Sequence, residues 1–118
     1  RQDIQLHFLP LSLKRPGVLD TFSGYTFNVS QSRPLSRGEI NITSPHPNDP
    51  PEIVANYLEE PSDKLTLING MNVARNIANA TAFDHFRNYE IRPGNSISSH
   101  DGMLEYVRKN STSLYHPA

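Results

Sequence analysis

Three stretches in the first half of the chain alternate apolar and polar residues. Residues 4–8, 25–30 and 39–44 place apolar side chains at every second position. This period of two is typical of β-strands with one apolar face. Between the first two stretches, a Pro-Gly pair at 16–17 predicts a loop. We expect the second and third strands to pair through the Ser-Arg-Gly turn at 36–38.

The middle of the chain changes to helical periodicity. Residues 45–52 contain four prolines, which exclude regular structure, and residues 53–60 are compatible with a short strand or a helical turn. Ser62 is placed to cap the following helix, and Asp63 favours the positive end of its dipole. Gly70 weakens this helix by about 1 kcal/mol relative to Ala. The apolar stripe of the helix consists of Leu65, Ile68, Met71, Val73, Ala74, Ile77 and Ala78.

The last third of the chain predicts further short elements. Residues 81–86 are expected to add a turn of helix, and residues 89–94 a short strand that ends at Pro-Gly. Ser98 or Ser99 can cap a second helix. A further strand begins near residue 112. Strands that precede helices in this order indicate an α+β fold with a mostly antiparallel sheet flanked by helices.

Composition excludes several classes of function. The 118 residues form one domain, 1–118. Eleven basic and twelve acidic residues give a net charge of −1, which offers no electrostatic reason to bind nucleic acid or an anionic membrane. The absence of cysteine excludes disulfides, thiolate catalysis and cysteine zinc sites. No apolar run reaches the roughly 18 residues that span a bilayer.

Five histidines are the main candidates for chemistry. No pair has the spacing of a helical zinc site, so we expect no metal. His46, His85 and His100 lie in polar loops or at helix ends, where exposed side chains are expected. His7 lies in the middle of a strand, on the face opposite the apolar one, and faces either solvent or a pocket. His116 precedes a proline and is either structural or a general base, and the ordinary imidazole pKa of about 6.5 suits the second role.

The order of several motifs resembles that of a known family. "RPLSRGEINITSPHPNDPPEIVANYLEEPSD" resembles the C-terminal region of the glucose–methanol–choline (GMC) oxidoreductases, through Ser36-Arg37-Gly38, Asp49-Pro50 and Asn56-Tyr57. The likeness continues through "INGMNVARNIANATAF", "EIRPG", "SSHDGMLEYVRKN" and "SLYHPA", and upstream through "DIQLHFLP" and "GYTFNVSQSRPLSRG". It covers nearly the whole chain and is strongest to the choline and alcohol dehydrogenase branch.

This resemblance implies a substrate-binding domain of an FAD-dependent oxidoreductase, with a largely antiparallel sheet and flanking helices. His116-Pro117-Ala118 matches the start of the family motif H-P-x-G-T-x-x-M-G, which opens with a catalytic histidine. By this likeness His116 is the general base that takes the hydroxyl proton of an alcohol during hydride transfer to flavin. Tyr115 and His7 match positions that border the substrate in choline-oxidising relatives, and Leu13 is a further candidate.

The resemblance also implies parts that lie outside the chain. The family's dinucleotide-binding G-x-G-x-x-G motif is not present, so we expect a fragment that is inactive alone and does not hold FAD. Its expected partners are a small alcohol and the missing FAD domain. Choline usually needs an aromatic cage, and the chain has no tryptophan, so choline and an aliphatic primary alcohol both stay open. The rival hypothesis is a stand-alone, non-enzymatic α+β binding module. A cytoplasmic location is expected. Secretion, and membrane association of the longer parent polypeptide to which the fragment would belong, are left open.

Overall fold

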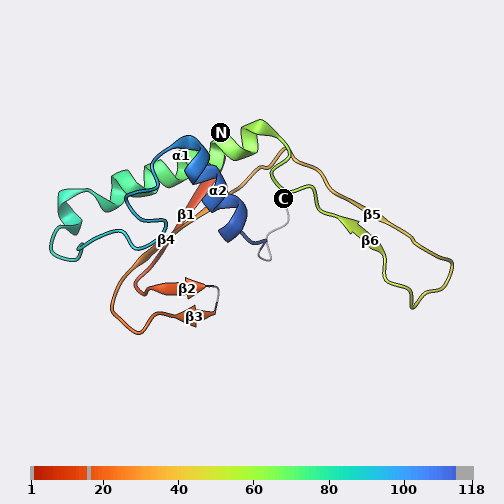
Figure 1. The fold of residues 1–118 in the computed structure, drawn as a ribbon, viewed down its shortest axis with the longest axis horizontal. Helices are drawn as coiled ribbons and strands as arrows, with labels where there is room; N and C mark the ends of the chain where they lie inside the picture. The colour runs from red at the N-terminus through yellow and green to blue at the C-terminus, as the bar shows by residue number, and fades with distance from the viewer. Residues whose placement is uncertain (1, 16, 114–118) are drawn as a thin grey trace.

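The computed structural model of the protein describes residues 2–15 and 17–113. The molecule is elongated, with principal extents of 60 × 31 × 26 Å (Figure 1). Within the described residues the strands form three separate two-stranded antiparallel sheets, which together with the helices confirm the α+β class. In chain order the elements are β1 (Ile4–Leu9), β2 (Leu13–Arg15), β3 (Val18–Leu19), β4 (Thr26–Gln31), β5 (Glu39–Asn41), β6 (Glu52–Val54), α1 (Pro61–Ala78), the 3₁₀ turn η1 (Thr81–Phe83) and α2 (His100–Asn110).

Strands β1 and β4 form the central pair, and α1 covers one of its faces. Leu6 lies opposite Val29 and Phe8 opposite Phe27, so the apolar positions of both strands share a face. Gly70 of α1 packs on that face, where an added Cβ would lie 2.6 Å from Val29 Cγ1. The glycine that weakens the helix in isolation therefore permits close packing of the helix on the strands.

The stretch predicted to be a loop contains a small hairpin instead. Strands β2 and β3 pair on either side of Gly17, whose φ of 76° suits glycine. Beyond the strands, the Asp20 N–H donates to the Ser12 carbonyl at 2.9 Å. Strands of two and three residues are too short for periodicity to reveal.

Strands β5 and β6 pair with each other and form an arm that extends away from the helices (Figure 1). The expectation that residues 25–30 pair with residues 39–44 is wrong, because the partner of β4 is β1. Alternation predicts that a stretch is a strand, but it does not name the partner strand. At the base of the arm, a Cβ on Gly38 would lie 2.5 Å from the Val54 carbonyl oxygen, so only glycine allows this approach.

The two helices differ in how they begin. The prediction that Ser62 caps α1 is wrong, since the helix begins at Pro61 with Glu60 as its N-cap residue and no side-chain cap. Proline suits the first helical position, where its missing N–H needs no partner. The prediction for α2 is confirmed at Ser99, whose Oγ accepts the Gly102 N–H at 3.2 Å.

The core lies where α1 meets the strand pair and α2. Leu65, Val73 and Ile77 of the predicted stripe stay partly exposed, because α2 and the strands cover only part of the helix surface. Within residues 2–15 and 17–113, no helix is long and apolar enough to cross a membrane. The buried apolar residues of this part of the chain are Ile68, Ala74, Met103 and Val107.

Ion pairs hold the segment between the helices. The turn η1 confirms the predicted extra turn of helix, but residues 89–94 do not form a strand: residues 89–90 are irregular and residues 91–94 form turns. Glu90 pairs with Arg75 of α1 at 2.8 Å, and Arg92 pairs with Asp20 beside the β2–β3 hairpin. Glu90 and Arg92 therefore bind neighbouring elements through their side chains, and the segment does not pair with another described strand.

Candidate substrate-facing site

His7 lies in the middle of β1, on the face that α1 does not cover. Its partner across the strand pair is Asn28, whose side chain is exposed. The Nε2 atom of His7 is buried and has no hydrogen-bond partner among the residues that the structure describes. A buried polar atom without a partner destabilises a fold by roughly 1–3 kcal/mol. His7 therefore does not simply face solvent, and its ring nitrogen suits a group that lies outside the described residues.

Aromatic rings pack against each other on the opposite face of the same strands. Phe8, Tyr25 and Phe27 contact Phe83 of η1, with ring centroids 5.3–6.1 Å apart across the group. Tilted and edge-to-face pairs of this kind contribute about 0.5–1.5 kcal/mol each. This aromatic group fixes the strand that carries His7, and a rigid strand is a good support for a binding residue.

The other residues of the predicted site are not brought to His7 by the described part of the chain. Tyr115 and His116 lie outside the described residues, so their roles stay predictions. Leu13 lies in β2, opposite Leu19 of β3, and is partly buried. The expectation of exposed side chains is confirmed for His46, His85 and His100.

A buried carboxylate at the start of α1 was missed by the sequence pattern. Asp63 is 1% exposed. It accepts hydrogen bonds from the Leu35 N–H at 2.9 Å and from the Gln31 side chain at 2.8 Å. The Ser36 N–H and hydroxyl donate to it at 2.8 and 2.5 Å. These donors lie 27 to 32 residues away in sequence, too far for any local pattern to indicate.

The charge of Asp63 is stabilised by these donors. Burial by itself raises the pKa of the carboxyl, but the hydrogen bonds from Leu35, Ser36 and Gln31 outweigh it and lower the pKa to about 2. The ionised side chain therefore joins α1 to the end of β4 and to the segment that leads into the arm.

The same junction explains several motif residues in structural terms. Ser36 Oγ donates to Asp63 and accepts the Glu60 N–H at 3.1 Å. Asn56 takes a φ of 50°, which asparagine tolerates better than most residues, and its side chain donates to the Arg37 carbonyl at 3.1 Å. These residues set the base of the arm, so their part in the family resemblance reflects folding rather than chemistry.

A second carboxylate joins the β2–β3 hairpin to the segment before α2. The Asp20 side chain is 8% exposed and accepts the Ser12 hydroxyl at 2.7 Å. The Ser12 hydrogen bond lowers the pKa of Asp20, and Arg92 lowers it further. Asp20 thus fixes the hairpin that follows β1, and Asp63 fixes the segment that follows β4.

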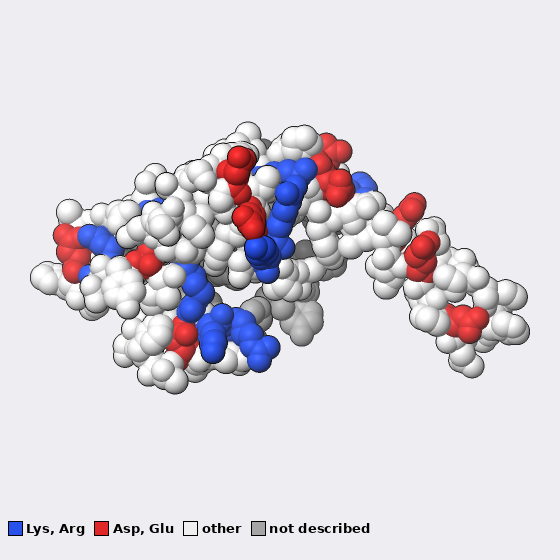
Figure 2. All heavy atoms as spheres, in the orientation of Figure 1, with Lys and Arg blue, Asp and Glu red and all other residues white. Residues whose placement is uncertain are grey.

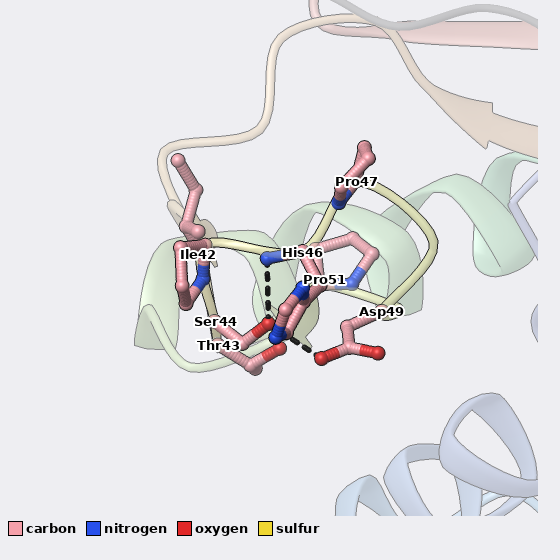
Figure 3. Close-up of a pocket in the computed structure, with 8 residues that line it drawn as sticks. Ile42, Thr43, Ser44, His46, Pro47, Asp49 and Pro51 are labelled. Atoms are coloured by element: carbon pink, nitrogen blue, oxygen red, sulfur yellow. Dashed lines mark hydrogen bonds between the residues drawn. The ribbon is translucent and has the colours of Figure 1, made fainter.

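The tip of the arm carries a shallow pocket, shown in Figure 3, with a serine, a histidine and an aspartate close together. The Ser44 hydroxyl donates to Asp49 at 2.5 Å, and the backbone N–H of His46 donates to Ser44 Oγ at 3.0 Å. The imidazole makes no bond to the hydroxyl, so the set lacks the nucleophile–base pair of a hydrolase. Among residues 2–15 and 17–113, no group of three or more His, Asp or Glu side chains could hold a metal.

Comparison with known sequences identifies the family of this chain. The sequence model of the GMC oxidoreductases, for the C-terminal part of these proteins, matches residues 34–118. The chain belongs to the GMC oxidoreductase family. The matched stretch contains the arm, both helices and Asp63 with its donors Leu35 and Ser36, whereas β1 with His7 and β4 with Gln31 precede it.

Individual GMC oxidoreductases resemble the whole chain. An alcohol dehydrogenase [acceptor] of Pseudomonas putida is 38% identical over 119 aligned positions, which cover 99% of this chain and 21% of that protein. An oxygen-dependent choline dehydrogenase of Photobacterium profundum is 38% identical and one of Staphylococcus xylosus 32% identical, each covering 98% of this chain and 21% of the relative. The chain therefore spans about a fifth of the length of these relatives.

The N-termini of α1 and α2 do not fit the diphosphate of FAD, the cofactor that the family implies. A helix N-terminus binds phosphate through free N–H groups and its positive dipole. The first turn of α1 is occupied by the ionised Asp63 carboxylate. The first turn of α2 carries Asp101, and its Gly102 N–H is already bound by Ser99. A helix N-terminus that binds this diphosphate would therefore lie outside residues 2–15 and 17–113.

Proposed function

We propose that this chain is the substrate-binding part of a GMC oxidoreductase that oxidises a primary alcohol, either choline or an aliphatic alcohol, to its aldehyde. The observation that carries the proposal is the buried Nε2 of His7, which lacks a partner among the described residues and lies on the face of the central strands that α1 does not cover. Relatives named alcohol dehydrogenase and choline dehydrogenase, which match nearly the whole chain, support the same substrate class.

In this proposal the chain supplies the groups that bind the alcohol and take its proton. His116 is the general base for the hydroxyl proton, a step that requires a neutral imidazole. His7 binds the substrate through Nε2, and Tyr115 borders the same site. FAD would supply the electron acceptor and would be bound by the remainder of the parent polypeptide.

A consequence is that the 118-residue chain alone is inactive and does not retain FAD. Purification of the chain in the presence of excess FAD, followed by gel filtration, should leave no flavin absorbance with the protein. A flavin band that travels with the chain in stoichiometric amount would contradict this part of the proposal.

The test of the substrate class uses the full-length parent. Anaerobic mixing with choline and with a series of aliphatic primary alcohols should bleach the flavin absorbance with at least one of them. A secondary alcohol of equal size is the matched control and should react much more slowly. Failure of every primary alcohol to reduce the flavin would contradict the proposed function.

A further inference from the structure

One face of the β5–β6 arm is apolar and bare. Ile40 lies directly opposite Ile53, so both side chains share a face of the arm. They are 69% and 68% exposed, and Ile42, which follows β5, is 90% exposed. The other face carries Asn41 opposite Glu52, with a hydrogen bond between the two side chains. The arm is therefore amphipathic, although it has no covered side.

An arm of this kind needs a partner to be stable. Two-stranded antiparallel pairs are marginally stable at best in water without a third strand or a covering element. Three exposed isoleucines on so short a pair mark an interaction surface. In Figure 1 the arm extends away from α1, α2 and the other strands, so none of these described elements covers it.

We propose that the isoleucine face of the arm, formed by Ile40, Ile42 and Ile53, docks on the remainder of the parent polypeptide. One observation and one physical argument identify this occupant. The relatives that match the whole chain extend over about five times its length, so most of such a protein is available to cover the arm. A segment of the same polypeptide is also present at high effective concentration, which favours it over a separate molecule.

The charge of the arm specifies the surface that it fits. The ionised residues of the arm between positions 39 and 54 are all acidic: Glu39, Asp49 and Glu52. Figure 2 shows these acidic side chains along the arm, away from the basic residues of the body. The docking surface on the rest of the parent should therefore be an apolar groove with lysine or arginine at its rim.

Cysteine labelling of the full-length parent tests this inference. The 118-residue chain has no cysteine, so the variants Ile40→Cys and Ile53→Cys each introduce one thiol whose reactivity reports whether the isoleucine face is covered. Asn41→Cys and Glu52→Cys are matched controls on neighbouring residues of the opposite face. In the native parent, maleimide should react about 10-fold more slowly at positions 40 and 53 than at 41 and 52, and equally at all four in urea. The unsubstituted parent gives the baseline.

Two outcomes would overturn the inference. Equal native reactivity at all four positions would mean that the face is bare in the parent. Protection that disappears on dilution would mean that a second copy covers the face. If a cysteine variant does not fold, hydrogen exchange of the backbone amides of the arm is measured in the unsubstituted parent instead. Slow exchange supports docking, and exchange at the rate of an unstructured peptide overturns the inference.

The inference shares one assumption with the proposed function, namely that the chain is part of a polypeptide about as long as the matched relatives. Labelling does not require turnover, so the two can fail separately. A parent that protects the arm but reduces its flavin with no alcohol would contradict the proposed function alone. A parent that oxidises an alcohol while its arm stays fully reactive would contradict the docking alone.

Discussion

Two strand pairs in this protein begin from the same kind of sequence and end in different environments. Both β1–β4 and β5–β6 are antiparallel, and both place apolar residues of the two strands on one shared face. In the first pair α1 packs on that face, with Gly70 against Val29. In the second pair Ile40 and Ile53 stay about two-thirds exposed. The same alternation thus specifies a strand face, while its cover comes from elsewhere in the polypeptide.

The difference in cover between the two strand pairs suits two different proposed roles, substrate binding and docking. The covered pair carries His7 on its second face and is held by aromatic rings on the first, which suits a rigid support for a substrate. The bare pair carries a histidine only at its tip, where His46 contributes a backbone N–H. Our proposals therefore assign substrate binding to the strand pair β1–β4 and docking to the arm.

The largest expected effect concerns this separation of tasks. In the full-length parent, His116→Ala should lower the rate of flavin reduction by about 10²–10⁴-fold, the usual contribution of a general base. His46→Ala on the arm is the matched control and should leave the rate unchanged. Anaerobic stopped-flow absorbance measures both. A wild-type rate in His116→Ala would remove the proposed base, and a slow His46→Ala would assign chemistry to the arm.

The second largest effect concerns the junction between the two regions. Asp63→Asn should lower the free energy of unfolding of the chain by about 3 kcal/mol, because the variant loses charge-assisted hydrogen bonds in a buried site. Glu59→Gln, at an exposed carboxylate nearby, is the control and should have little effect. Urea unfolding followed by circular dichroism measures the difference. Equal stability of the two variants would show that the junction does not hold the arm.

The pH dependence of stability tests the same carboxylate. Its pKa in the folded chain, about 2, lies below the ordinary value of 3.8, so ionised Asp63 stabilises the fold above about pH 4. This stabilisation, about 2 kcal/mol, should be lost as the pH falls from 3.8 towards 2. Asp63→Asn should show a correspondingly flatter profile over that interval. A parallel loss in both proteins would assign the acid sensitivity to other carboxylates.

The sequence predicted elements better than it predicted their partners. Alternation located β1 and β4, and helical periodicity located α1 and α2, because these signals are local. The pairing of β4 with β1 rather than β5, and the cap of α1, depend on contacts that no local pattern contains. The Asp63 site shows the limit most clearly, since Asp63 was predicted only to favour the helix dipole although it binds a segment some 27 residues away.

The candidate site was predictable only through family resemblance. Residue pattern alone placed His7 on the second face of β1 and left it between solvent and pocket. The buried Nε2 excludes the first alternative for that atom, and its role in substrate binding stays a proposal. Tyr115 and His116 lie outside the described residues, so their assignment still depends on the motif they resemble.

A fourth prediction concerns the close packing that distinguishes the covered pair. Gly70→Ala should destabilise the chain by about 1 kcal/mol, because overpacking against Val29 exceeds the gain in helix propensity. Val29→Ala in the same molecule removes the crowding atom, so the double variant should be more stable than the sum of the single effects predicts. Strict additivity in urea unfolding, or a stabilising Gly70→Ala, would show that α1 does not lie so close to β4.

The smallest expected effect is the most direct measure of the difference between the two pairs. In the 118-residue chain, Ile53→Ala should change the free energy of unfolding by less than about 0.5 kcal/mol, because its side chain is mostly exposed. Val29→Ala, under α1, should cost about 1–2 kcal/mol by the loss of partly buried methyl groups that pack on the helix. In the full-length parent the docked arm should bring the cost of Ile53→Ala close to that of Val29→Ala. If the two substitutions already cost the same in the isolated chain, the arm is covered there by the chain itself, and the contrast between the two pairs is wrong.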